Sequence, residues 1–339
     1  MKPRLLAKAL GWAAGALLFA LVVLFVYARL SYSSSYLLLP DSPHALAPLV
    51  KVKDARKGDK GSLYFVDVIE RRATLAERYL PFLRDDATLV PAQDLGPSNI
   101  SDKQRARIDA AAMTLSKKTA AAVALRRLGY KVVVQPRGAL VQQTQPGTSA
   151  STRLLPGDVI TAIDGKPTLD FGRLHSLITR HHAGERVRIT FTRAGREHTT
   201  VLRTFASAGS PHVTLIGVVI TQAASIKLPI QVTIDAGNVG GPSAGLAFAL
   251  ELTDKLGSDV DRGYRVAATG ELLLDGSVEP IGGVKQKVIG ARRAGIQIML
   301  VPAGENANEA KRYAGTMKII PVTSFQQALH ALTTAGLKR

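Results

Sequence analysis

A serine stands at a glycine-rich junction between an apolar strand and an apolar helix. The segment Asn238–Gly245 joins a predicted strand over Ile230–Ile234 to a predicted helix over Pro242–Leu256. Glycine lets a backbone approach a bound peptide closely, and proline suits the first turn of a helix. A serine there lies at the positive end of the helix dipole, where unpaired amides can stabilise an oxyanion. Gly241, Pro242 and Ser243 therefore indicate a nucleophile and its surroundings, although a serine in this place can also be an ordinary helix cap.

A lysine in a second segment could serve as the base for this serine. A Gly-Gly turn at Gly282-Gly283 leads into a predicted helix over Lys285–Ala294, and Lys287 shares the inward face of that helix with Val284. An amine on an apolar face loses hydration and releases its proton more readily, as a general base must. The alternative is a surface lysine whose stem lies along the helix.

These two segments belong to an ordered series of motifs that resembles the proteolytic domain of Lon proteases. The matching residues are Gly241–Gly245, Thr269–Glu271, Asp275–Val278, Ile281–Lys287, Ala294–Ile296 and Val301-Pro302, within a region from about Ile220 to the C-terminus. The resemblance implies a catalytic dyad of Ser243 and Lys287, with Thr269 hydrogen-bonded to the lysine amine. It also implies polypeptide substrates and a homo-oligomeric ring, such as a hexamer.

The sequence implies neither a cofactor nor a metal. No Gly-x-x-x-x-Gly-Lys-Ser/Thr run occurs, because Gly165-Lys166-Pro167-Thr168 lacks the upstream glycine and has no Ser/Thr directly after the lysine. Any proteolysis by this chain would therefore be independent of ATP. His181 and His182 have no partners at metal-ligand spacing and are interpreted as surface residues. Asp235 precedes the serine segment, and we leave it out of the dyad.

The middle of the chain resembles a PDZ domain. Leu155–Ile160 followed by Ile163–Gly165 is the turn-and-strand pattern of that fold, although Ser149 stands where bacterial members usually have proline. Such domains bind an extended peptide as an added strand and hold its carboxylate with backbone amides. Gly138, Ala139 and Leu140 are the candidates for this role. The alternative is a module that only braces the protease.

An apolar run near the N-terminus predicts a transmembrane helix. Ala9–Leu30 is long enough to cross a hydrocarbon core of ~30 Å, and Lys2, Arg4 and Lys8 precede it. The positive-inside rule then places the N-terminus in the cytoplasm and the later domains outside the cell membrane, as a single-pass protein. A cleaved signal peptide is the alternative, but Tyr27–Tyr32 is not a small-residue cleavage site.

The net charge of +18 does not point to nucleic acid as a partner. The basic residues are scattered, with no arginine-rich run and no interleaved aromatic residues. A basic surface that faces anionic lipid headgroups is the simpler explanation. The chain has no cysteine, which excludes disulfides and a cysteine nucleophile.

The fold class that follows is multidomain: an N-terminal transmembrane helix, a β-rich PDZ-like domain and an α+β Lon-type proteolytic domain. Ser31–Ser35 and Pro40–Pro43 are rich in turn-forming residues and predict a juxtamembrane linker, with a helix from about Ser101 to Leu128 beyond it. We predict four parts, namely residues 1–30 (tip and membrane helix), 31–125 (linker and N-terminal part), 126–206 (PDZ-like) and 207–339 (Lon-like).

This order of parts is similar to that of the PDZ-containing, ATPase-free Lon-like proteases of bacteria. The expected function is an ATP-independent, membrane-anchored serine endopeptidase whose PDZ-like module recruits unfolded polypeptides or C-terminal peptides. The competing hypothesis is a non-catalytic, membrane-anchored PDZ scaffold.

Overall fold

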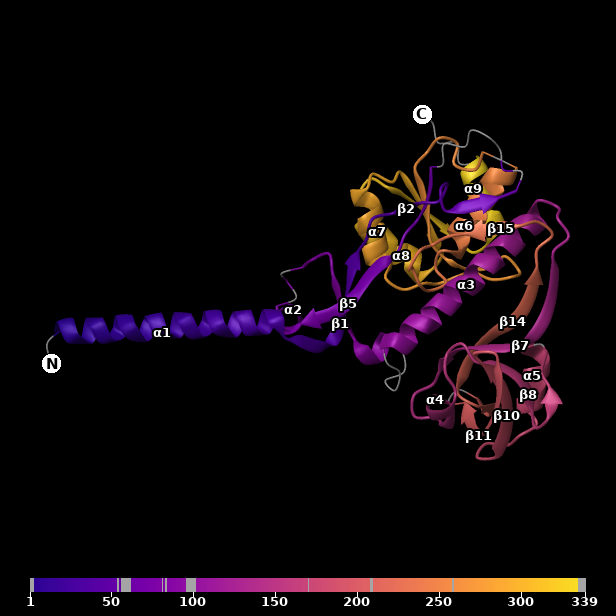
Figure 1. The fold of residues 1–339 in the computed structure, drawn as a ribbon, viewed down its shortest axis with the longest axis horizontal. Coiled ribbons are helices and arrows are strands. Elements are labelled where there is room, and N and C mark those ends of the chain that lie inside the picture. The colour runs from indigo at the N-terminus through magenta and orange to yellow at the C-terminus, as the bar shows by residue number, and fades with distance from the viewer. Residues whose placement is uncertain are drawn as a thin grey trace.

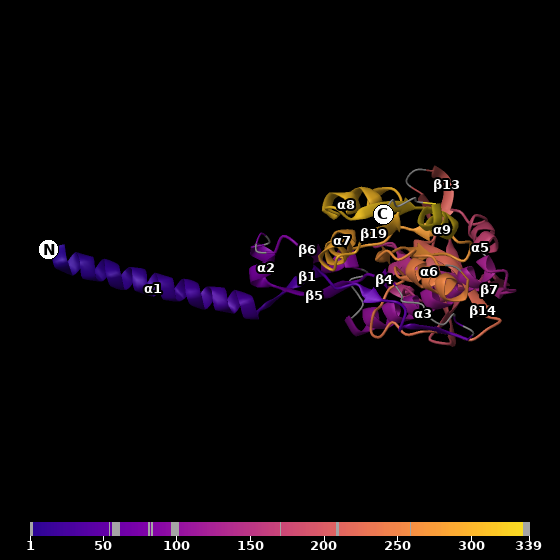
Figure 2. The same cartoon turned by 90° about the horizontal axis from the view of Figure 1, so that it is seen from above.

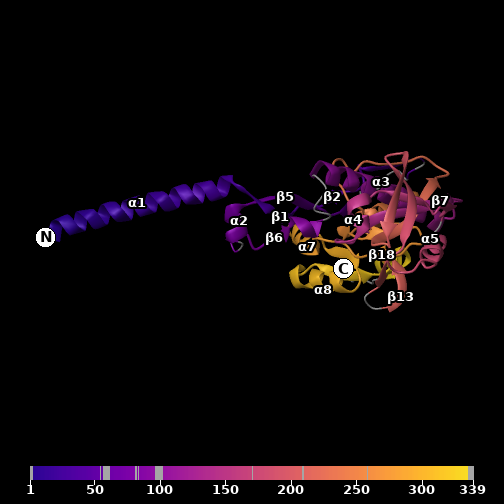
Figure 3. The ribbon, with the colours of Figure 1, turned by 90° about the horizontal axis from the view of Figure 1, so that it is seen from below.

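A long N-terminal helix stands apart from the folded part of the molecule. The computed structural model describes residues 3–53, 55, 62–80, 82, 84–95, 102–169, 171–207, 210–257 and 259–334. Helix α1 (Pro3–Leu30) projects away from everything else in all three ribbon views (Figures 1, 2 and 3). Its stretch Trp12–Leu30 has a mean hydropathy of 2.2 and buries nothing against the protein, and it is the one candidate span among the described residues. A helix that exposes apolar side chains all round needs an apolar surrounding.

The segment predicted as a linker is a strand. β1 (Tyr32–Pro40) pairs antiparallel with β5 (Val68–Thr74) and with β6 (Thr88–Pro91) in a three-stranded sheet. Leu37 and Leu39 are buried there with Ala73, and Ser33 and Ser35 are small enough to be buried as well. Helix α2 (Leu75–Tyr79) and the 3₁₀ helix η2 (Ala92–Leu95) follow β5 and β6. The prediction of a linker from the serine-rich composition was therefore wrong. Buried and more exposed side chains alternate along most of β1, as in a strand that pairs within a sheet.

The C-terminal half is built on a five-stranded sheet with helices on both faces. The strand order is β2 (His44-Ala45), β4 (Leu63–Phe65), β16 (Val266–Ala268), β19 (Ile298–Pro302) and β20 (Lys318–Val322), and all neighbours are parallel except β2 and β4. Helices α6 (Gly245–Leu256) and α9 (Phe325–Thr334) pack on one face. Helices α7 (Val284–Arg293) and α8 (Glu305–Tyr313) pack on the other. A parallel sheet needs this cover because both of its faces are apolar.

Residues before the PDZ-like part complete this same domain. Besides β2 and β4, helix α3 (Asp102–Arg127) packs against α6, and β3 (Val50–Val52) pairs with β15 (Val232–Ile234). Leu63 and Phe65 lie in one apolar core with Phe248. The small hairpin of β17 (Glu271-Leu272) and β18 (Val278-Glu279) lies beside α3 and α6. The predicted division at residues 31–125 therefore separates elements that share one core.

The PDZ-like part is a second sheet inserted between α3 and β15. Its strand order is β11 (Arg196–Arg203), β10 (Arg186–Arg193), β8 (Val159–Ile163), β7 (Val133–Thr144) and β14 (Val218–Lys227), with β9 (Lys166-Pro167) beside β8. Helices α4 (Ser149–Arg153) and α5 (Phe171–Ile178) accompany it, and the ribbon β12 (Phe205–Ser207) and β13 (Ser210–Leu215) precedes β14. Strand β14 falls beyond the predicted boundary at residue 206, yet it completes this sheet. Figure 1 shows α3 running between the two domains.

Candidate active site

The loop that carries Ser243 is fixed to helix α3. The amide of Gly241, whose φ is +83°, donates to the carbonyl of Asp109 at 2.9 Å, and the Ser116 hydroxyl donates to the carbonyl of Pro242 at 3.0 Å. The positive φ favours glycine at this position. The helix itself begins at Gly245, three residues later than predicted, so Pro242 lies in a turn ahead of it. Ser243 is half-buried, so part of the residue faces solvent.

Lys287 lies next to Ser243, on the inward face of α7. Its amine Nζ is 2.9 Å from Ser243 Oγ, and only 4% of the residue is exposed. Burial lowers the pKa of Lys287 to about 8, while the nearby Asp67 carboxylate acts in the opposite direction. Lys285, two residues earlier, points elsewhere and donates to the carbonyl of Ala87 at 3.0 Å. The second lysine of the pair is therefore the one brought to the serine.

Thr269 and Gly270 hold the serine backbone from the end of strand β16. The Thr269 hydroxyl donates to the Ser243 carbonyl at 3.2 Å, and the Gly270 amide donates to the same oxygen at 2.8 Å. Lys287 Nζ lies 3.5 Å from Thr269 Oγ1, at the outer limit of a hydrogen bond. Thr269 is fully buried. It is thus placed where the resemblance implied, but its stronger contact is to the carbonyl of the serine.

Two backbone amides near Ser243 are available for a ligand. Among the described residues, the amides of Ser243 and Ala244 donate to no protein acceptor, whereas the amide of Leu246 is used by the Gly270 carbonyl. They immediately precede α6, where the helix dipole favours negative charge. This pair of donors could stabilise an oxygen that becomes negative during acyl transfer.

The predicted peptide-binding residues of the PDZ-like domain lie inside its sheet. Strand β7 is flanked by β8 and β14, with Ala139 opposite Ile160 on one side and Gln222 on the other. The Gly138 amide donates to the carbonyl of Leu169 at 3.1 Å. Our assignment of Gly138, Ala139 and Leu140 to strand addition and carboxylate binding is therefore incorrect, because an interior strand has no free edge.

A cleft of about 1400 Å³ separates the PDZ-like sheet from the domain that carries Ser243. Pro242 and Leu272–Leu274 line it from one side, and Leu140–Thr144 of β7 with Val219 and Thr221 of β14 line it from the other. The Gln142 amide group donates across the domain boundary to Glu271 at 3.2 Å. The cleft thus runs from the edge of the PDZ-like sheet to the residue before Ser243.

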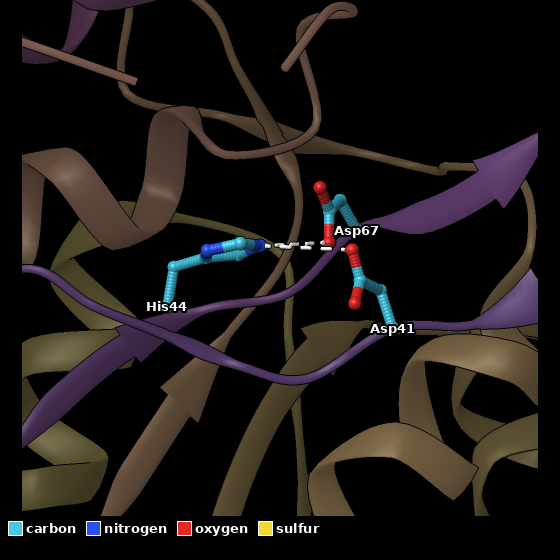
Figure 4. A group of neighbouring side chains, drawn as sticks. All are labelled: Asp41, His44 and Asp67. Carbon is cyan, nitrogen blue, oxygen red and sulfur yellow. Dashed lines mark hydrogen bonds and ion pairs between the residues drawn. The ribbon is translucent and has the colours of Figure 1, made fainter. Parts of the chain in front are cut away.

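Asp41, His44 and Asp67 form a charged cluster that we did not identify from the sequence (Figure 4). His44 Nε2 is 3.2 Å from Asp67 Oδ1 and 3.9 Å from Asp41 Oδ2. The ligand atoms of these three residues lie within 4.8 Å of one another, a spacing that would suit a cation. Asp254, Asp259 and Asp261 form another such group.

His181 and His182 have acidic neighbours that the sequence did not reveal. His181 Nε2 lies 2.9 Å from Asp164 and its Nδ1 lies 3.1 Å from Glu185, which also contacts His182 at 3.0 Å. The two nitrogens of His181 face different carboxylates, so these groups form ion pairs and do not converge on one ion.

Comparison with known proteins defines the class of both domains. Residues 210–334 match the model of the Lon protease (S16) C-terminal proteolytic domain, and residues 126–204 match that of the PDZ domain. The chain therefore combines a PDZ domain with a proteolytic domain. More particularly, the proteolytic domain is of the Lon type, as predicted from the sequence.

Curated relatives match this chain over the protease region. Lon protease 2 of Thermus thermophilus is 38% identical over 117 residues, which are 33% of this chain and 14% of that protein. Lon protease 1 of Sorangium cellulosum is 44% identical over 81 residues, which are 23% of this chain and 10% of that protein. The chain thus spans only a small part of the length of these relatives.

A solved PDZ domain of an SdrC-like protein from Listeria monocytogenes aligns with 25% of this chain and 88% of its own, at 21% identity and a TM-score of 0.24. The assignment of the PDZ domain depends on the family model and not on this alignment.

Proposed function

We propose that this chain is a serine endopeptidase in which Ser243 is the nucleophile and Lys287 the general base. The observation that carries the proposal is the 2.9 Å contact between Ser243 Oγ and a lysine amine that is almost completely buried. An amine in that environment can be neutral near pH 8 and can then accept a hydroxyl proton. The match to a Lon-type proteolytic domain supports the same chemistry.

The reaction follows from the positions of these groups. Neutral Lys287 takes the proton from Ser243 Oγ, which attacks the carbonyl carbon of a peptide bond. The amides of Ser243 and Ala244 stabilise the resulting oxyanion. Protonated Lys287 then gives its proton to the leaving amine, and a water molecule activated by Lys287 hydrolyses the acyl-enzyme. Thr269 and Gly270 keep the serine backbone in place throughout.

The pH dependence of activity tests this mechanism. Because only neutral Lys287 accepts a proton, kcat/KM on an unstructured polypeptide should rise with pH, with a midpoint near the pKa of about 8, and then level off. Full-length protein in detergent micelles, assayed without ATP, is the appropriate sample. A profile that does not change between pH 7 and pH 9.5 would mean that Lys287 is not the base.

We further propose that the PDZ domain recruits polypeptides to the protease through the outer edge of strand β14. This strand ends the sheet, so one of its edges has no strand partner in the sheet order. Its residues Val219 and Thr221 line the cleft that reaches Pro242. A peptide added to this edge would run alongside the cleft that reaches the residue before the nucleophile. Binding of C-terminal peptides by full-length Ser243→Ala protein should be lost when their carboxylate is amidated; equal affinity for both forms would exclude carboxylate recognition.

The N-terminal helix is proposed to anchor this protease in the cell membrane, with the PDZ and proteolytic domains on the extracytoplasmic side. Its exposed apolar surface and the preceding Lys2, Arg4 and Lys8 support that topology. A homo-oligomeric ring, such as a hexamer, also remains a proposal, and the mass of the detergent-solubilised protein by light scattering tests it.

A further inference from the structure

Asp67 reaches the active-site edge of the central sheet because of how two strands pair. Strands β4 and β16 are parallel, with Phe65 opposite Ala268. Thr269 is the next residue after Ala268, and Asp67 is the second residue after Phe65. Parallel strands end at the same edge of a sheet, so Asp67 and Thr269 arrive on the same side. Asp67 comes from the part of the chain that lies outside the match to the Lon-type domain.

The residues on either side of Asp67 pack against the helix that carries Lys287. Val66 is buried in a cluster with Val284 and Val288 of α7. A Cβ at Gly283, which immediately precedes α7, would lie 2.9 Å from a methyl group of Val68. The backbone on both sides of Asp67 is therefore held against the first half of α7, from which the Lys287 side chain leaves.

A histidine holds the Asp67 side chain in place (Figure 4). His44 Nε2 lies 3.2 Å from Asp67 Oδ1, and the imidazole stacks on the Phe65 ring at 4.7 Å between centroids. Asp41 is held against α7 as well, because a Cβ at Gly290 would lie 2.0 Å from its carbonyl oxygen. The carboxylate of Asp67 therefore has a defined position at the edge of the sheet that also carries Thr269.

The other charged groups on α7 are directed away from the site. Lys285 contacts the carbonyl of Ala87, Arg292 contacts the carbonyl of Tyr313, and Arg293 forms an ion pair with Asp86. Burial lowers the pKa of Lys287, and the field of Asp67 raises it. Burial raises the pKa of Asp67, which His44 and Lys287 lower and Asp41 raises. Asp67 is thus the carboxylate that acts on Lys287, and Asp41 acts on Asp67.

We propose that Asp67 is a positioning residue that stabilises the protonated form of Lys287 and so sets the lower limit of the pH range in which this lysine can act as a base. The inference rests on the proposed Ser243–Lys287 mechanism. A negative charge near an amine favours its charged form, so Asp67 keeps the protease less active at low pH than burial of Lys287 alone would allow. His44 keeps the carboxylate in the position from which it acts.

The test is the pH profile of the full-length Asp67→Asn protein. Asparagine keeps an oxygen for His44 but loses the charge. The midpoint of kcat/KM should move to lower pH, so that one pH unit below the wild-type midpoint the variant cleaves faster than wild type, with the same plateau at high pH. Asp41→Asn is the matched control, since it removes a carboxylate beside the same histidine but should leave the midpoint in place. Asp67→Glu, which restores the charge, should bring the midpoint back toward the wild-type value.

An unchanged midpoint in Asp67→Asn, or an equal shift in Asp41→Asn, would overturn the inference. Titration of Lys287 by ¹³C NMR of labelled lysine in Ser243→Ala protein gives the same answer without activity, with Lys287→Ala used to assign the signal. The Lys287 amine should titrate at lower pH in the double variant Ser243→Ala/Asp67→Asn than in Ser243→Ala. If it does, but Ser243→Ala cleaves as fast as wild type, the effect of Asp67 on Lys287 is supported and the proposed function is wrong. If Asp67→Asn does not fold, the wild-type protein still provides a test. The ¹³C signal of Lys287 should then shift when acid protonates Asp67, and the absence of such a shift would overturn the inference.

Discussion

Replacing Lys287 with alanine should lower kcat/KM by about 10³-fold, because no other base among the described residues lies within hydrogen-bonding distance of the serine hydroxyl. Lys287→Arg should be as inactive as Lys287→Ala. A guanidinium keeps the positive charge and a similar length but cannot be deprotonated near neutral pH. The measurement is the initial rate of cleavage of an unstructured polypeptide by the full-length variants.

The same helix provides the control for this prediction. Lys285→Ala removes another lysine of α7, whose amine is bonded to the carbonyl of Ala87 and not to the serine. Its activity should stay close to that of wild type. If Lys287→Arg kept activity within about tenfold of wild type, Lys287 would act by its charge and not as a base.

Phe65→Ala should destabilise the proteolytic domain by about 3–5 kcal/mol, although Phe65 lies outside the matched Lon-type region. This ring is 1% exposed, contacts Phe248 of α6 at 5.7 Å between centroids and stacks on His44. Removing it leaves a cavity in the core shared by the two parts of the chain. Thermal unfolding followed by circular dichroism measures the effect as a lower Tm.

Phe82→Ala is the matched control because its ring is 69% exposed and comes from the same N-terminal part. It should change stability by no more than about 0.5 kcal/mol. Equal melting temperatures for Phe65→Ala and Phe82→Ala would show that residues 31–125 do not stabilise the proteolytic domain.

The residues of the proposed dyad could be predicted because each follows a local signal. Ser243 comes after a glycine-rich turn and before an apolar helix, and Lys287 comes after a Gly-Gly turn in the first half of another helix. The predicted helices over Pro242–Leu256 and Lys285–Ala294 agree with α6 and α7 to within three residues at each end. Local turn chemistry and helical periodicity determine such elements, so they can be read from neighbouring residues.

The N-terminal part could not be predicted in the same way. Strand β4 has only three residues, and its place between β2 and β16 depends on contacts with residues that are distant in the sequence. Nothing near Asp67 in the sequence indicates that it meets His44 or approaches Lys287. The antiparallel pairing of β2 with β4 brings His44 to Asp67, and the parallel register of β4 with β16 brings Asp67 to the same edge of the sheet as Thr269. Register is a property of the assembled sheet.

The PDZ domain illustrates the same limit. Its turn motif, most of its strands and helix α5 follow from local patterns between Gly138 and Arg203. Strand β14 lies beyond the ribbon of β12 and β13, yet it pairs with β7 along nearly its whole length. This pairing makes β7 an interior strand and β14 one of the two outer strands of the sheet, which no local pattern in Gly138–Leu140 reveals.

The most direct test of the central claim compares wild-type and Ser243→Ala protein, both full-length and in the same detergent, with a disordered model polypeptide at pH 9 and without ATP. We expect fragments with wild type and an intact polypeptide with Ser243→Ala, at equal Tm for the two proteins. Equal fragmentation by both would contradict the account, because cleavage would not need Ser243. An intact polypeptide with both would also contradict it and would favour a scaffold that binds peptides through its PDZ domain without cleaving them.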